Sequence, residues 1–242
     1  MHLHVILALL ILVGFGAGFV QRVSGFGLGI FAMIFLPYFM PTSTAAATVS
    51  CLFSCGTSSY NSIKYRKNIS YKTTLPMLIS ALITIPIAVF FASKISGEVF
   101  TVLLGIILVL LSIFFLFLSN RIKMKANVPN GIISGSTSGV LSGLFSTGGP
   151  PAVIYLSSSL DDKLVYFATI QFYFAVTNIY ATATRAINGL LTLTLLGYAL
   201  VGFIGCMLGD LVGRLVFDRL DGEKLKKVIY VGMILSGVVM II

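Results

Sequence analysis

Long apolar segments follow one another along almost the whole chain, and this pattern constrains the fold more than any other feature of the sequence. A helix needs about 20 mainly apolar residues to cross a bilayer. Charged residues make up only 10% of the chain, whereas a soluble domain carries about 25%. The sequence therefore predicts an all-α polytopic membrane protein with eight to ten membrane segments. These segments cover residues 3–20, 28–40, 42–63, 73–93, 98–119, 131–146, 150–160, 164–184, 193–217 and 228–242.

Two of the segments, 28–40 and 150–160, are too short to cross a bilayer comfortably, because a helix rises only about 1.5 Å per residue. Each follows a longer segment across a break rich in glycine, SGFGLG at residues 24–29 and STGGPP at residues 146–151. The short second helices favour re-entrant pairs, which enter the membrane and return, over pairs that cross it twice. Either arrangement leaves the chain on the side where it began.

The same order of elements occurs twice, since three ordinary apolar segments follow each long–short pair. A shift of 121 residues aligns glycines of the two halves: Gly14 with Gly135, Gly18 with Gly139, and Gly27 with Gly148. The sequence therefore predicts two repeats within a single membrane domain. The first covers residues 1–120, the second covers residues 127–242, and residues 121–126 form the linker.

The distribution of basic residues predicts that the two repeats are inverted, because basic loops face the cytoplasm. The loop after the third segment of the first half carries Lys64, Arg66, Lys67 and Lys72, whereas its counterpart carries only Arg185. In the next loop the first half has Lys94 and Glu98, and the second half has Arg214, Arg219, Lys224, Lys226 and Lys227. The linker, with Arg121, Lys123 and Lys125, is then cytoplasmic, and both termini lie on the outer side.

The two breaks are the predicted binding site. Non-helical backbone at membrane depth is tolerated where it is buried in protein or lines a polar cavity, and broken helices at equivalent places in inverted halves point to a transporter's site. A helix that begins inside the membrane presents free N–H groups and the positive end of its dipole, which suits an anion. The alternative is that the breaks are tight turns at the membrane surface.

The candidate donors of such a site are backbone N–H groups and hydroxyls in the breaks. In the second break they belong to Ser146, Thr147, Gly148 and Gly149. In the first break they belong to Ser24, Gly25, Phe26 and Gly27. Arg22 is close by in sequence and either contacts the substrate or extends to the membrane interface.

A few further polar residues fall within the spans. Gln171 and Asn178 are seven residues apart and so share a helix face, where they either line the cavity or form hydrogen bonds between helices. Asp210 and Arg214 are four apart and are interpreted as a structural ion pair, although a membrane carboxylate can also carry a coupling proton.

Small residues at helical spacing are predicted to pack helices together. Glycines recur every four residues in two runs: Gly131, Gly135, Gly139 and Gly143, and Gly205, Gly209 and Gly213. The three cysteines are interpreted in the same way, as small packing residues that form neither a disulfide nor a metal site: Cys51, Cys55 and Cys206.

Four stretches of the sequence resemble the TauE/SafE family of membrane transporters, also called the sulfite exporter or four-toluene-sulfonate-uptake family. GVLSGLFSTGGPPAVIYL (139–156) is similar to the second glycine motif of that family. GAGFVQRVSGFGLGIFAMIFLP (16–37) is similar to its first, although Phe26 and Leu28 interrupt the usual run of glycines. AAATVSCLFSC (45–55) and YRKNI (65–69) fit the segment and basic loop that follow. The resemblance implies a bacterial inner-membrane transporter of small anions, often sulfur oxyanions or organosulfonates, and thus periplasmic termini.

The predicted function is a secondary transporter that moves a small anion, such as sulfite or an organosulfonate, by alternating access. The alternatives are an anion channel and an intramembrane enzyme, and the chain has no HExxH or GxSxG motif that would support the enzyme. The expected partners are the anion, the lipid bilayer and a coupling proton or sodium ion, with no cofactor. The net charge of +9 resides in the loops between apolar segments, and so it does not indicate nucleic-acid binding.

Overall fold

The computed structural model describes residues 2–118, 124–216 and 222–242. Within these residues, each of the ten predicted apolar segments forms an α-helix, and no strand occurs. Five predicted basic side chains lie outside the described part: Arg121, Lys123, Arg219, Lys224 and Lys226.

The first half of the chain forms helices α1 (Leu3–Ser24), α2 (Leu28–Phe35), α3 (Ser43–Lys64), α4 (Tyr71–Lys94) and α5 (Gly97–Ile113). Short 3₁₀ turns cover Leu36–Tyr38 and Arg66–Asn68, and a π-helical turn, Phe114–Leu118, extends α5. The second half forms helices α6 (Val128–Phe145), α7 (Gly149–Ser159), α8 (Lys163–Ile187), α9 (Leu193–Val216) and α10 (Gly222–Ile241). As predicted, α2 and α7 are short, with 8 and 11 residues.

Side-chain caps fix where several of these helices begin. Thr42 accepts a hydrogen bond from the Ala45 amide at the start of α3, and Asn127 accepts one from the Asn130 amide at the start of α6. Asp162 accepts bonds from two amides in the first turn of α8. Each cap satisfies backbone N–H groups that have no acceptor within the helix.

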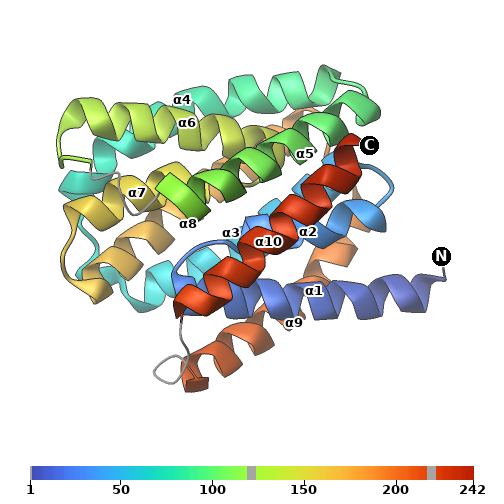
Figure 1. Cartoon of the computed structure of the whole chain (residues 1–242), viewed down its shortest axis with the longest axis horizontal. Helices are drawn as coiled ribbons and strands as arrows, with labels where there is room; N and C mark the ends of the chain where they lie inside the picture. The colour runs from blue at the N-terminus through green and yellow to red at the C-terminus, as the bar shows by residue number, and fades with distance from the viewer. Residues whose placement is uncertain (1, 119–123, 217–221) are drawn as a thin grey trace.

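The helices pack as four main pairs: α1 with α9, α4 with α6, α3 with α8, and α5 with α10 (Figure 1). The two glycine runs lie in close helix contacts, as predicted. A Cβ at Gly135 would collide with the Met77 carbonyl of α4, and a Cβ at Gly209 would collide with the Phe15 carbonyl of α1. Small residues thus allow the backbones of the α4–α6 and α1–α9 pairs to touch.

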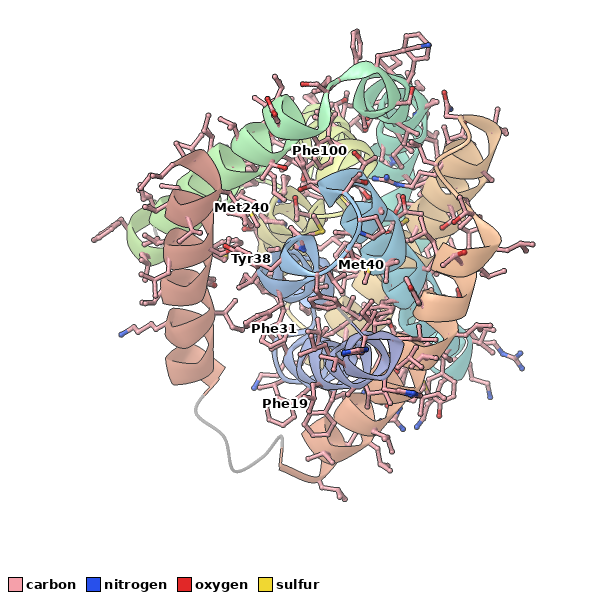
Figure 2. The ribbon with its side chains drawn as sticks, turned by 90° about the vertical axis from the view of Figure 1, so that its right-hand side faces the viewer. Phe19, Phe31, Tyr38, Met40, Phe100 and Met240 are labelled. Atoms are coloured by element: carbon pink, nitrogen blue, oxygen red, sulfur yellow. The ribbon has the colours of Figure 1, made fainter. Side chains whose placement is uncertain are left out.

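Five of the described helices are long and apolar enough to cross a membrane: α1, α4, α5, α8 and α9. Large apolar side chains project outward on many sides of the molecule (Figure 2), far more than a soluble monomer exposes. The long helices α3 and α6 carry many serines, threonines and glycines, most of them buried. The interior of this protein therefore contains many polar residues beside its apolar core.

Both termini of the described chain lie at one end of the molecule, and the starts of α4 and α6 lie at the opposite end (Figure 1). One predicted loop charge is wrong. Arg185 is not in an outer loop but within α8, and its side chain is fully buried. The sequence-based assignment failed because α8 continues past Arg185 for two more residues, to its cap at Asn188.

Candidate functional site

The two glycine breaks contact each other, and a small polar cavity lies where they meet. A Cβ at Gly29, in the first turn of α2, would collide with the carbonyl oxygen of Ser146 in the second break. Phe26 of the first break also packs beside Gly149 of the second. Glycine at position 29 is therefore required for this contact.

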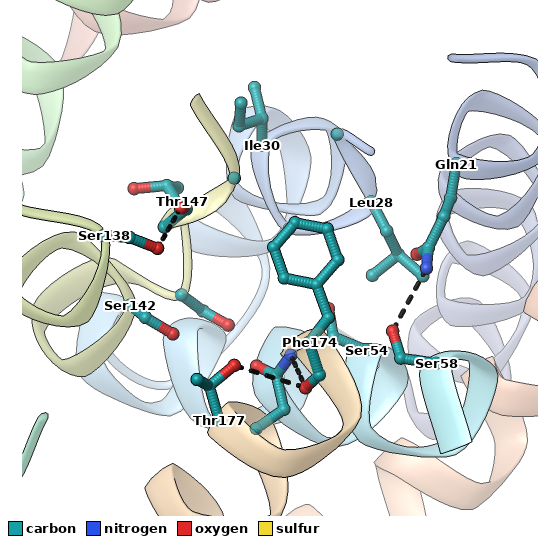
Figure 3. A pocket seen from close by; sticks show the side chains of 16 residues that line it. Gln21, Leu28, Ile30, Ser54, Ser58, Ser138, Ser142, Thr147, Phe174 and Thr177 are labelled. Atoms are coloured by element: carbon teal, nitrogen blue, oxygen red, sulfur yellow. Dashed lines mark hydrogen bonds between the residues drawn. The ribbon is translucent and has the colours of Figure 1, made fainter. Parts of the chain in front are cut away.

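The cavity has a free volume of about 30 Å³, which is room for about two water molecules. In Figure 3, Phe174 projects into the middle of the view, with Ser138, Ser142 and Thr147 on one side and Gln21 and Ser58 on the other. None of the described lining residues has a charged side chain. They are Gln21, Gly27, Leu28, Gly29, Ile30, Ser54, Ser58, Ser138, Ser142, Ser146, Thr147, Gly148, Gly149, Phe174, Thr177 and Asn178.

The second break supplies the least satisfied polar groups of the cavity. Ser146 and Thr147 are 6% and 1% exposed, and neither hydroxyl has a hydrogen-bond partner among the described residues. Ser146 also has a positive φ of 60°, the only such value for a non-glycine residue in the described chain. Buried polar groups are almost always hydrogen-bonded, so these two hydroxyls are the candidate ligand-binding groups of the cavity.

Some backbone groups of the same break form hydrogen bonds within the protein, and others lie at the cavity. Ser138 donates a hydrogen bond of 2.5 Å to the Gly148 carbonyl and so fixes the path of the chain. Gly148 is the N-cap of α7 and Gly149 its first residue, where an amide has no acceptor in a preceding turn. Pro150, in the first turn, has no N–H to leave unsatisfied. The positive end of α7 therefore points at the cavity.

The first break contributes less than the sequence predicted. Its glycines take left-handed conformations, with φ of 79° at Gly25 and 93° at Gly27, and of the predicted donors only Gly27 lines the cavity. The Ser24 hydroxyl donates to the carbonyls of Val20 and Phe26 within its own loop. Ser24 is therefore occupied by the backbone rather than free for a ligand.

Gln171 forms hydrogen bonds between helices and does not line the cavity. Its Nε2 donates to the Gly25 carbonyl at 3.0 Å, and its Oε1 accepts a bond of 2.7 Å from Gln21. Gln21 in turn donates to Ser58 of α3. Asn178, seven residues further along α8, does line the cavity, and its Nδ2 donates to the Phe174 carbonyl.

Arg22 lies outside the cavity, at the last turn of α1. Its guanidinium stacks at 5.1 Å from the ring centre of Phe167 and donates a long hydrogen bond, 3.4 Å, to the Tyr65 hydroxyl. Tyr65 precedes the basic turn Arg66–Asn68. The environment of Arg22 is thus aromatic, and the structure does not bring it to the groups of the two breaks.

Several lining residues escaped the sequence analysis. They share a short polar side chain on an interior helix: Gln21, Ser54, Ser58, Ser138, Ser142 and Thr177. Two signals were available. Ser54 and Ser58, and likewise Ser138 and Ser142, are one helical turn apart, and the shift of 121 residues that aligns the halves places Gln21 on Ser142.

The predicted pair of Asp210 and Arg214 is confirmed as an ion pair within α9. Arg214 also lies 5.5 Å from the ring centre of Tyr60, whereas Asp210 is only 4% exposed. The cysteines are free in the described structure, with Cys51 and Cys206 buried, as expected for packing residues.

Apolar helices of membrane length around buried polar residues, with broken helices that meet at a small cavity, are typical of a helical membrane transport protein. A family comparison specifies it further, because residues 10–240 match the model of the sulfite exporter TauE/SafE family. The chain therefore belongs to that family. No curated protein and no solved structure matches it significantly.

Proposed function

We propose that this protein is a secondary transporter that binds one small sulfur oxyanion, such as sulfite, in the cavity between the two breaks. The observation that carries this proposal is the pair of buried hydroxyls of Ser146 and Thr147, which have no partner within the described protein. The chain also belongs to a family described as sulfite exporters. A pyramidal oxyanion accepts several hydrogen bonds at once, so it suits two hydroxyls next to free helix N–H groups.

The lining of the cavity favours an anion of small size. The described lining has no carboxylate to repel an anion, and the first turns of α2 and α7 both contribute to it. Free N–H groups and the positive ends of these helices stabilise negative charge. A free volume of about 30 Å³ suits sulfite better than a bulky organosulfonate, which would require the breaks to separate.

The architecture behind this mechanism is a pair of inverted repeats, in which each helix of the first half corresponds to the helix five places later. The helix pairing supports the correspondence. If each helix is replaced by its counterpart in the other half, the α1–α9 pair becomes the α4–α6 pair. The α3–α8 and α5–α10 pairs remain the same. Such symmetry allows two states of equal construction that open to opposite sides, as alternating access requires.

The membrane orientation follows from the loop charges. The basic turn between α3 and α4 and the start of α6 lie at one end of the molecule and both termini at the other. With basic loops in the cytoplasm, the termini are periplasmic and the protein spans the inner membrane of a bacterium. Its partners are then the anion, the lipid bilayer and a coupling proton or sodium ion.

Transport of labelled sulfite into proteoliposomes tests the proposal. A carrier is expected to saturate and to show counterflow, whereas a channel would show neither. Thr147→Val removes one of the two unpartnered (orphan) hydroxyls while keeping the side-chain shape. Losing one charge-assisted hydrogen bond, worth about 1.5–3 kcal/mol, should weaken sulfite binding roughly ten- to a hundredfold.

The matched control is Thr137→Val, because Thr137 is an exposed residue of α6 whose hydroxyl bonds only to its own helix. Its sulfite affinity should equal that of the unmodified protein. If Thr147→Val folds and binds sulfite as tightly as this control, the second break is not the site. If the unmodified protein neither binds nor transports sulfite, the substrate assignment is wrong.

A further inference from the structure

Arg185 is the most deeply buried charged side chain of the described structure. It extends from α8 with 0% exposure. No carboxylate of the described residues lies within ion-pair distance of Arg185. The ion pair among the described residues joins Asp210 and Arg214. A buried charge without compensation is strongly destabilising. Other groups must therefore compensate the guanidinium.

The compensating groups are the last carbonyls of α6. Nη2 of Arg185 donates to the Gly143 carbonyl at 2.8 Å and to the Leu144 carbonyl at 3.2 Å, and Nη1 donates to the Thr48 hydroxyl at 3.3 Å. Carbonyls in the last turn of a helix have no intrahelical partner and carry the negative end of its dipole. The guanidinium thus more than offsets the partial negative charge at the end of α6, which is about half an elementary charge.

This arrangement completes the bonding of the α6 end just before the second break. The carbonyls of Leu141 and Ser142 accept bonds from the amides of Thr147 and Ser146. Arg185 satisfies the next two carbonyls along the chain. Backbone hydrogen bonds and one arginine therefore fix the turn that carries the hydroxyls of Ser146 and Thr147.

Removal of Arg185 would have two effects on the cavity. The carbonyl end of α6 would lose the donor that fixes it, so that Ser146 and Thr147 would lose their fixed position. The negative end of α6 would also act on the cavity without compensation, because Ser142 and Ser146 belong both to that end and to the lining. Both effects disfavour a bound anion.

We propose that Arg185 is a positioning residue of the anion site, which acts through the end of α6 and does not touch the substrate. This inference rests on the proposed function for its substrate, an oxyanion in the cavity. It assigns the positive charge that makes a cavity with a neutral lining selective for anions. The charge contacts the carbonyls at the end of α6 and does not line the cavity.

The test compares Arg185→Met, which keeps the length of the side chain without its charge, with Arg185→Lys, which keeps a charge and donors. Two quantities are measured on purified protein in detergent: the dissociation constant for sodium sulfite and the hydrogen-exchange rates of the Ser146 and Thr147 amides. For Arg185→Met we expect at least tenfold weaker sulfite binding and at least tenfold faster exchange. For Arg185→Lys we expect both within about threefold of the unmodified protein.

Thr48→Val is the matched control, because it removes the third partner of the guanidinium and leaves both carbonyl bonds in place. Its two readouts should remain unchanged. If Arg185→Met does not fold, the neutral and polar Arg185→Gln replaces it with the same expectations. Faster exchange with unchanged sulfite affinity in the folded variant would reduce Arg185 to a structural role and overturn the inference.

Weaker binding with unchanged exchange would also overturn it, since Arg185 would then act on the anion without holding α6. The proposed function fails separately. If the unmodified protein does not bind sulfite, the substrate is wrong. The exchange rates of the variants then still decide whether Arg185 holds the second break.

Discussion

Ser146 combines two unfavourable features that a folded protein rarely keeps without a reason. Its φ of 60° is a left-handed conformation, which costs a residue with a side chain about 1–2 kcal/mol. Its buried hydroxyl has no partner, which costs about 1–3 kcal/mol. The residue that the 121-residue shift places opposite it is Gly25, with φ of 79°. Glycine is thus the natural occupant of this turn.

We predict that Ser146→Gly stabilises the empty protein and weakens its binding of sulfite. The substitution relieves both costs, and against them stands the greater freedom of glycine in the unfolded chain, about 0.5–1 kcal/mol. The free energy of unfolding should therefore rise by about 1 kcal/mol or more. The lost hydrogen bond to the anion should weaken binding roughly ten- to a hundredfold.

The assay is thermal unfolding in detergent, first without sulfite and then over a sulfite titration. A ligand that binds the folded protein raises its apparent stability, so each variant yields both its intrinsic stability and its affinity. Ser146→Ala is the matched comparison. It also removes the hydroxyl but keeps a side chain at positive φ, so it should bind as weakly as Ser146→Gly and melt at a lower temperature.

Two results would refute the reasoning. If Ser146→Gly melts below the unmodified protein without sulfite, the hydroxyl stabilises the fold through a bond of its own. If both variants bind sulfite with unaltered affinity, Ser146 is not part of the site. Opposite changes of stability and affinity are the mark of a residue kept for function at the expense of stability.

Three further predictions follow from other contacts. Gly29→Ala should separate the two breaks and abolish sulfite counterflow in proteoliposomes, and retained counterflow would show that the contact is dispensable. Asp210→Asn should lower the free energy of unfolding by about 1.5–3 kcal/mol, because it breaks an ion pair whose carboxylate is buried and whose guanidinium is partly exposed. It should leave the pH profile of transport unchanged, and a lost pH dependence would instead make Asp210 the coupling site. Single cysteines at Asn68 and Asn188, in a chain without Cys51, Cys55 and Cys206, should react differently with an impermeant thiol reagent, and equal labelling from outside would contradict the inverted orientation.

The helices could be predicted because their signals are local. Apolar length specifies a membrane helix, and a run such as Ser146–Pro151 interrupts it wherever it occurs. The packing role of the two glycine runs could also be predicted, since a small residue every four positions marks a face that another backbone approaches. Gly135 and Gly209 confirm this. Their partner helices, α4 and α1, could not be named from the sequence, because the helix that packs against a glycine run depends on the fold.

The cavity could be predicted only in part, because its lining combines residues from distant helices. The second break was the correct place to look for orphan hydroxyls. Ser24 shows the opposite case, where a hydroxyl that a motif offers to a ligand is taken by nearby carbonyls. Such competition between backbone and ligand depends on the local turn and not on composition. Ser138 and Ser142 read as ordinary small residues of a packing helix until α6 is placed beside the break.

The largest error in the sequence analysis concerns α8 and shows how this helix serves both breaks. Gln171 and Arg185 lie fourteen residues apart on it, with Asn178 midway between them. Gln171 donates to the carbonyl of Gly25 at the end of α1, and Arg185 donates to the carbonyls at the end of α6. A single helix thus covers the negative ends of both broken helices. The uncovered ends are the positive ones of α2 and α7, so in the proposed site the α8 contacts to both carbonyl ends favour an anion over a cation.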